Sequence, residues 1–202
     1  MTVTRLLAIG LLTLALAGCG SDSKDEAPST KSAAPPPAST TAPTADCQPL
    51  AGAKLTAQKS PERMNPQPMY LTDVFSIEPE TCSNRVVFEF EKQPPGPAYD
   101  VSYQPASTAK IEDGSGNPIE VAGEAFLVVK LTAMTAKVDG DQVTRTYTGP
   151  QRVTGTAPIE EVVKTGDFEG VVTWVIGLDR KRPFTTASSD SALVVEIDHV
   201  LP

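Results

Sequence analysis

The sequence predicts an all-β fold, a β-sandwich of about eight to ten short, mostly antiparallel strands. Apolar and polar residues alternate with a period of two in several short runs, as in half-buried strands. Turns rich in Gly and Pro separate these runs at close spacing, which is typical of sandwiches and barrels. No segment carries an apolar stripe with a period of 3.6 residues, so we expect little helix.

Four runs show the alternation most clearly: Arg85–Glu91, Ala125–Leu131, Val171–Leu178 and Ala192–Asp198. The expected turns contain Gly, Pro, Asp or Asn and lie at Pro94–Pro97, Asp113–Pro118, Asp139–Asp141, Thr148–Pro150 and Gly166–Asp167. The segment Asp113–Asn117 also suggests a calcium loop. It lacks the further ligands and the terminal Glu of such a loop, so a hairpin turn is favoured.

Residues 1–18 have the features of a lipoprotein signal peptide that is cleaved after export. Met1–Arg5 is positively charged, and the apolar run Leu6–Ala17 is too short to span about 30 Å of hydrocarbon. The run ends in Leu16-Ala17-Gly18-Cys19, which resembles the bacterial lipobox. The resemblance implies cleavage before Cys19 and acylation of Cys19, including a diacylglycerol and palmitate-type chains. An ordinary secretory signal beside a chance cysteine is the alternative.

Lipidation of Cys19 would place the protein on the extracytoplasmic face of the cell membrane, where two or three acyl chains anchor it stably. Residues 19–46 then form a linker rich in Pro, Ala, Ser and Thr, which we expect to be disordered because it has no large apolar side chains to bury. Residues 47–69 are a Pro-rich lead-in, and residues 70–202 are the β-sandwich domain. The membrane is therefore the first expected partner, reached through the lipid.

Export implies an oxidising compartment in which disulfides persist. With Cys19 acylated, Cys47 and Cys82 are the remaining cysteines, and we expect them to form a disulfide. Two free thiols are the alternative.

The charge of the chain disfavours two classes of partner. It has 25 Asp and Glu against 17 Lys and Arg, and the part that follows the linker keeps 21 acidic and 14 basic residues. Nucleic-acid binding relies on clustered Lys and Arg, so no nucleic-acid partner is expected. Electrostatic attachment of basic residues to an anionic bilayer is disfavoured for the same reason.

Catalytic residues are not indicated, and we expect the protein not to be an enzyme. His199 is the only histidine, and one histidine cannot supply the ligand set of a zinc hydrolase. No nucleophile elbow accompanies it, and no pattern marks a carboxylate pair for glycoside cleavage. His199 extends the apolar face of the last strand, so we expect it to cap the end of that strand. No metal or cofactor is expected.

A local cluster of basic residues at Asp179–Phe184 supplies three candidate ligand contacts, Asp179, Arg180 and Arg182. The arginines would hold carboxylates or phosphates of the cell wall through bidentate hydrogen bonds. The favoured alternative is a solvated loop in which Asp179 pairs with its own arginines.

Trp174 and Arg85 are the other two candidate ligand contacts. The indole of Trp174 would stack on a sugar ring, but its position on the apolar face of its strand favours a core role. Arg85 opens an apolar strand. It would either contact a ligand or, as we prefer, pair with Glu89 or Glu169.

Several of these segments together resemble the AMIN-like domain of actinobacterial lipoproteins: Asn84–Phe90, Gly114–Pro118, Tyr147–Pro150, Gly166–Gly170, Trp174, Gly177–Arg180 and Arg182–Phe184. The resemblance runs from about Tyr70 to His199. AMIN domains proper are small β-sandwiches attached to cell-wall amidases and secretins, and they are thought to localise them by contacting peptidoglycan. The resemblance to the AMIN-like domain therefore implies a β-sandwich that binds peptidoglycan or another wall component. The alternatives are a protein-interaction module that docks an envelope or secretion complex, and, third, an enzyme or lipid carrier.

Overall fold

The computed structural model describes residues 47–202, except 62–66, 68 and 81, and all of them belong to one compact unit. The predicted signal peptide, the predicted lipidation site Cys19 and the predicted linker lie outside the described residues. Within the described part of the chain, no helix has the length and apolar character needed to cross a membrane.

Twelve strands and one short helix make up this part of the chain. The longer strands have six or more residues: β2 (Met69–Glu80), β3 (Ser83–Phe90), β4 (Tyr99–Gln104), β5 (Ala125–Met134), β9 (Ile159–Phe168), β10 (Val171–Leu178) and β12 (Ala192–Asp198). The shorter elements are β1 (Gln58–Lys59), α1 (Ala106–Ala109), β6 (Ala136–Asp139), β7 (Gln142–Arg145), β8 (Arg152–Thr154) and β11 (Phe184–Ser188).

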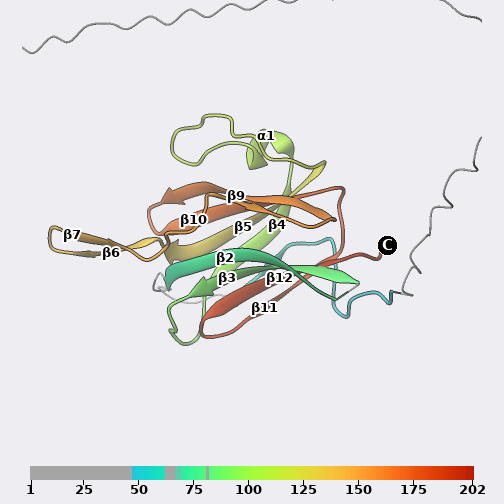
Figure 1. Ribbon diagram of the computed structural model, residues 1–202, viewed down its shortest axis with the longest axis horizontal. Coiled ribbons are helices and arrows are strands. Elements are labelled where there is room, and N and C mark those ends of the chain that lie inside the picture. Colours follow the sequence, from blue (N-terminus) through green and yellow to red (C-terminus); the bar gives the residue numbers. More distant parts are fainter. Residues whose placement is uncertain (1–46, 62–66, 68, 81) are drawn as a thin grey trace, which may run out of the picture. The chain divides into compact units, whose positions relative to one another are not determined.

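Ten of the strands form one sheet in the order β11-β12-β3-β2-β5-β10-β9-β8, with β4 paired to β5 and to β1. Pairing in it is antiparallel except at a short parallel ladder, where Met69 and Tyr70 face Ala133 and Met134. This ladder joins what we call the first half (β11, β12, β3, β2) to the second half (β1, β4, β5, β10, β9, β8). In Figure 1 the first half lies below the second half, and the hairpin β6–β7 projects to one side. The predicted mostly antiparallel all-β fold is confirmed, but the described residues form twelve strands rather than about eight to ten, and ten of them belong to one sheet.

The apolar faces of the two halves pack around a single core. The alternation predicted which side chains point inward, and these are at most 6% exposed: Val86, Phe88, Phe90, Ala125, Leu127, Val129, Leu131, Val172, Trp174, Ile176, Leu178, Leu193, Val195 and Ile197. The four predicted strands are confirmed as β3, β5, β10 and β12, and the bounds of β10 and β12 agree with the prediction.

A second, smaller apolar layer covers the outer face of the second half. Here α1 and the loop that follows it lie over β5, β9 and β10 (Figure 1), and the buried residues in contact are Ala109, Val121, Phe126, Val128, Val163 and Val175. The loop crosses β10 at Gly177, where a Cβ would lie only 1.9 Å from the carbonyl oxygen of Ala122. Glycine at this position therefore lets the loop approach the strand closely.

The turn predicted at Gly166–Asp167 is wrong. Both residues lie within β9, and the chain reverses at Glu169 and Gly170, which have φ values of 50° and 76°. Gly166 faces Thr173 of β10 next to a bulge in the β9–β10 ladder. A Cβ on Gly166 would lie 2.2 Å from Oδ2 of Asp113, so this glycine makes room for an incoming carboxylate rather than for a turn.

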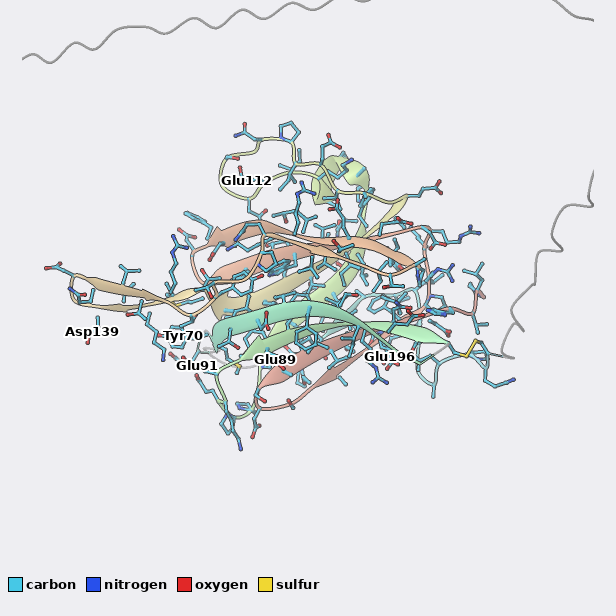
Figure 2. All side chains as sticks on the ribbon, viewed as in Figure 1. Tyr70, Glu89, Glu91, Glu112, Asp139 and Glu196 are labelled. Carbon is cyan, nitrogen blue, oxygen red and sulfur yellow. A yellow bond between two sulfur atoms is a disulfide. The ribbon has the colours of Figure 1, made fainter. Side chains whose placement is uncertain are left out.

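The predicted disulfide joins Cys47 and Cys82, with their Cα atoms 5.3 Å apart (yellow in Figure 2). It ties the start of the described chain to the turn between β2 and β3. The C-terminal end of the chain meets the same corner, because the backbone N–H of His199 donates to the carbonyl of Cys82 at 3.0 Å. The buried carboxylate of Asp198 accepts from the backbone N–H of Leu50 at 2.8 Å.

Candidate functional site

The loop that follows β10 is held together by its own charges. Arg182 donates two hydrogen bonds to Asp179, from Nε to Oδ1 and from Nη2 to Oδ2, both 2.8 Å long. Arg180 adds a contact of 3.3 Å from Nε to Oδ2 of the same carboxylate. The pairing of Asp179 with its own arginines, which the sequence favoured, is therefore what the structure shows.

Arg182 is also tied to the rest of the domain. Its Nη1 donates to the carbonyl of His199 at 2.7 Å. The hydroxyl of Tyr103 donates to the Arg182 carbonyl at 2.8 Å and accepts from the Arg182 backbone N–H at 2.9 Å. With three donors of its guanidinium used inside the fold, Arg182 positions the loop. Arg180, 61% exposed, and the exposed Lys181 are the cations of this loop that face solvent.

We expect Asp179→Asn to lower the free energy of unfolding by about 1–3 kcal/mol at neutral pH, because it breaks a charged hydrogen-bonded pair. The hydrogen bond from Arg182 lowers the pKa of Asp179 below its ordinary value. Such a carboxylate stabilises the fold above its unfolded-state pKa of about 4, and this contribution is lost as the pH falls through the folded-state pKa. Urea unfolding at several pH values should therefore show the difference between wild type and variant narrowing in acid.

The matched control is Asp139→Asn, at the exposed tip of the β6–β7 hairpin (Figure 2). It should change stability by less than about 0.5 kcal/mol at any pH. A difference between wild type and Asp179→Asn that stays constant down to about pH 2 would contradict the role of the Asp179 charge.

Arg85 pairs with a residue other than the two expected. Its Nη2 lies 3.0 Å from Oε1 of Glu196, which faces it across the β3–β12 ladder. Glu89 lies four residues away along the same strand, about 13 Å at strand rise, whereas directly opposed residues lie about 5 Å apart. The same Glu196 oxygen accepts from the hydroxyl of Ser83 at 2.6 Å. Arg85 thus has a structural partner, and its side chain is 37% exposed.

Trp174 lies in the core with no exposed surface. Its ring makes edge-on contacts with Phe88 and Tyr147, at centroid distances of 6.1 and 5.7 Å. A sugar-stacking role needs an open aromatic face, so burial removes Trp174 from the candidate ligand contacts. The core interpretation holds.

His199 follows the last strand, and its ring Nε2 contacts Oδ1 of Asn84, whose amide donates to the carbonyl of Thr156 at 3.0 Å. These contacts link the end of the chain to β3. In the part of the chain that the structure describes, no group of three or more His, Cys, Asp and Glu side chains is arranged to hold a metal ion.

A cavity of about 120 Å³ lies on the outer face of the second half, and no sequence pattern predicted it. It lies between the loop after α1 and the strands β5, β9 and β10, with polar lining residues Gln104, Thr108, Asp113, Lys130, Thr165 and Thr173. The fold brings these lining residues together from segments up to about seventy positions apart in the sequence. No local motif could therefore predict the cavity. Gly166 was the one local signal, since it makes room for Asp113.

Together, the fold and these sites define a disulfide-tied, mostly antiparallel β domain with a polar cavity on one outer face. The chain belongs to the AMIN-like domain family, because the AMIN-like domain model matches residues 71–199, more than half of its length. No curated protein and no solved structure matches the chain. Membership of this family suggests a role in the cell envelope or in association with peptidoglycan.

Proposed function

We propose that the protein is a lipoprotein of the cell envelope, anchored to the extracytoplasmic face of the cell membrane through Cys19, whose AMIN-like domain binds peptidoglycan or another wall component without catalysing a reaction. The match of the AMIN-like domain over residues 71–199 carries this proposal. The acidic character of the chain supports an anchor made of acyl chains rather than of charge.

The loop after β10 is the surface that best supports a contact with acidic wall polymers. Asp179 and Arg182 neutralise each other and fix the backbone, while Arg180 and Lys181 extend from it into solvent. Lys181 lies over the ring of Tyr103 at 5.6 Å, which fixes its position further. A rigid loop that presents two cations loses little conformational entropy when it binds an anionic partner.

Co-sedimentation with purified cell walls tests the proposal. We expect the full chain, kept soluble in mild detergent, to pellet with walls, and the double variant Arg180→Ala/Lys181→Ala to bind about threefold more weakly or worse, as for the loss of exposed charges. Arg145→Ala, an exposed arginine on β7, is the matched control and should bind like wild type. Failure of the wild-type chain to pellet at low salt would contradict wall binding.

A protein-interaction role is the second candidate, and the β6–β7 hairpin favours it. Val138 and Val143 face each other across the ladder of this hairpin and are 64% and 66% exposed. An apolar pair on a projecting hairpin suits docking to a protein partner. Cross-linking in cells from position 142 would then recover one stoichiometric partner, while isolated walls retain none of the protein.

A further inference from the structure

The cavity on the outer face of the second half carries two opposite charges that do not neutralise each other. Lys130 extends from the centre of β5, and Asp113 comes from the loop after α1. Both side chains are exposed, and among the described residues neither forms an ion pair or a side-chain hydrogen bond. The same cavity therefore offers a cation and an anion for a ligand to bind.

The position of Asp113 is fixed by the fold. Its backbone N–H donates to the carbonyl of Thr165 at 2.8 Å, which holds the loop against β9. Its carboxylate lies against Gly166, where any side chain would collide with it. The glycine in β9 thus keeps a place for this carboxylate at the wall of the cavity.

Among the described residues, Lys130 has no ion-pair partner, because Asp100, the acidic residue opposite it in the sheet, pairs with another lysine. Asp100 faces Lys130 directly across the β4–β5 ladder, but its Oδ2 pairs with Lys59 of β1 at 2.8 Å. This carboxylate in turn raises the pKa of Lys59. The ion-pair partner of Asp100 is therefore Lys59, and among the described residues the Lys130 ammonium has no ion-pair partner.

A third polar group belongs to the same cavity. Thr173 faces Lys130 across the β5–β10 ladder and is 3% exposed. Its hydroxyl is buried, with no hydrogen-bond partner among the residues that the structure describes. A buried hydroxyl without a partner is costly, and Thr173 is one of the residues that line the cavity.

The volume limits the size of the ligand. A cavity of about 150 Å³ holds a benzene molecule, so about 120 Å³ accommodates five or six non-hydrogen atoms. That is the size of glycine or alanine and is too small for a pyranose ring with its substituents. Lys130 also lines a second hollow of about 270 Å³, which leaves room for the remainder of a longer ligand.

We infer that this cavity binds a zwitterionic α-amino-acid unit, with its carboxylate on Lys130 and its ammonium on Asp113. Either a free amino acid or a wall peptide unit with unblocked α-amino and α-carboxyl groups supplies this chemistry. The inference does not depend on the proposed binding of the wall.

Titration of the full chain with D-alanine and L-alanine, followed by calorimetry or NMR, tests the inference. We expect one or both to bind with a dissociation constant of about 1 mM or tighter. Alaninamide lacks the carboxylate and N-acetylalanine lacks the ammonium, so each should bind at least about tenfold more weakly. Equal binding of these blocked compounds, or no binding of either alanine, would overturn it.

Three variants locate the site. Lys130→Met, Asp113→Asn and Thr173→Val should each weaken alanine binding about tenfold, whereas the exposed controls Lys92→Met and Asp139→Asn should not. The fold should survive in all three, because Lys130 and Asp113 are exposed and the Thr173 hydroxyl has no partner to lose in the described structure. Unchanged alanine binding by Lys130→Met, with an unchanged melting temperature, would place the ligand elsewhere.

Wall co-sedimentation of the same variants separates the two sources of the ligand. Loss of wall binding in Lys130→Met assigns the amino-acid unit to the wall, and retention assigns the cavity to free amino acids. Walls that never bind the wild-type chain would refute the proposed function and leave the alanine titration to decide this inference.

Discussion

Trp174→Ala should lower the free energy of unfolding by about 3–5 kcal/mol, the cost of removing a large aromatic side chain from a packed core. Trp174 has no exposed surface, and its ring lies between Phe88 of the first half and Tyr147. The substitution would therefore open a void where the two halves of the sheet meet. Because a domain has only about 5–15 kcal/mol of stability, we expect much of the variant to be unfolded at 37 °C.

Trp174→Phe is the matched control for this prediction. The indole N–H has no hydrogen-bond acceptor among the described residues, so phenylalanine loses volume but no hydrogen bond. It should cost less than the alanine variant by at least about 1 kcal/mol. Urea unfolding followed by circular dichroism measures both, since Trp174 is the only tryptophan and its fluorescence is lost in both variants. A stable Trp174→Ala variant that has lost wall binding would contradict the core role of Trp174 and indicate a ligand contact instead.

The strands that the sequence predicted are those with uninterrupted alternation. In β10 and β12, every second residue from Val172 to Leu178 and from Leu193 to Ile197 is buried in the core. Alternation on the face toward the core can be recognised without knowing which strand lies opposite, although the other face of β10 is buried as well.

Two long strands that were missed, β2 and β9, carry irregularities in the ladder. In β2, the register shifts between Leu71 and Asp73, so the buried residues Leu71 and Val74 are three apart instead of two. In β9, bulges interrupt the pairing with β10 at two places. A bulge moves the following side chains to the other face, which breaks the period of two on which the prediction relies.

The alternation of apolar and polar residues also could not predict the second apolar layer. Phe126 and Val128 lie on the outer face of β5 and are buried only because α1 and its loop cover them. Whether an outward side chain meets solvent or another segment depends on long-range packing, not on its own strand.

The candidate site residues show the same limit. Arg180 and Arg182 were candidates because they lie close together in the sequence, and the same short spacing lets Asp179 neutralise Arg182. Lys130 and Asp113 stand out only after the sheet has placed Asp100 beside Lys59. Lys130 and Asp113 are candidate ligand contacts because the fold leaves their charges unpaired among the described residues. The spacing of residues in the sequence does not show which charges will be unpaired.

The double variant Cys47→Ser/Cys82→Ser should lower the free energy of unfolding by about 3–4 kcal/mol, because the disulfide closes a loop of 35 residues in the unfolded chain. The bond also lies at the corner where Leu50 donates to Asp198 and Cys82 accepts from His199. Guanidinium unfolding of the oxidised protein, the reduced protein and the double variant measures the effect. The last two should unfold together, and the double variant should not respond to reductant.

Hydrogen exchange separates the two ways in which the bond can act. Lys54 and Phe184 exchange two backbone hydrogen bonds of 3.0 and 3.1 Å and so attach the lead-in to β11. If the disulfide acts on the unfolded chain, the Lys54 amide should lose no more protection than the core amides of β10 when the bond is removed. If the bond instead holds the lead-in in place, the Lys54 amide alone should exchange faster while the unfolding midpoint stays nearly constant. That second outcome would contradict the predicted loss of global stability and would make the disulfide a local clamp on residues 47–59.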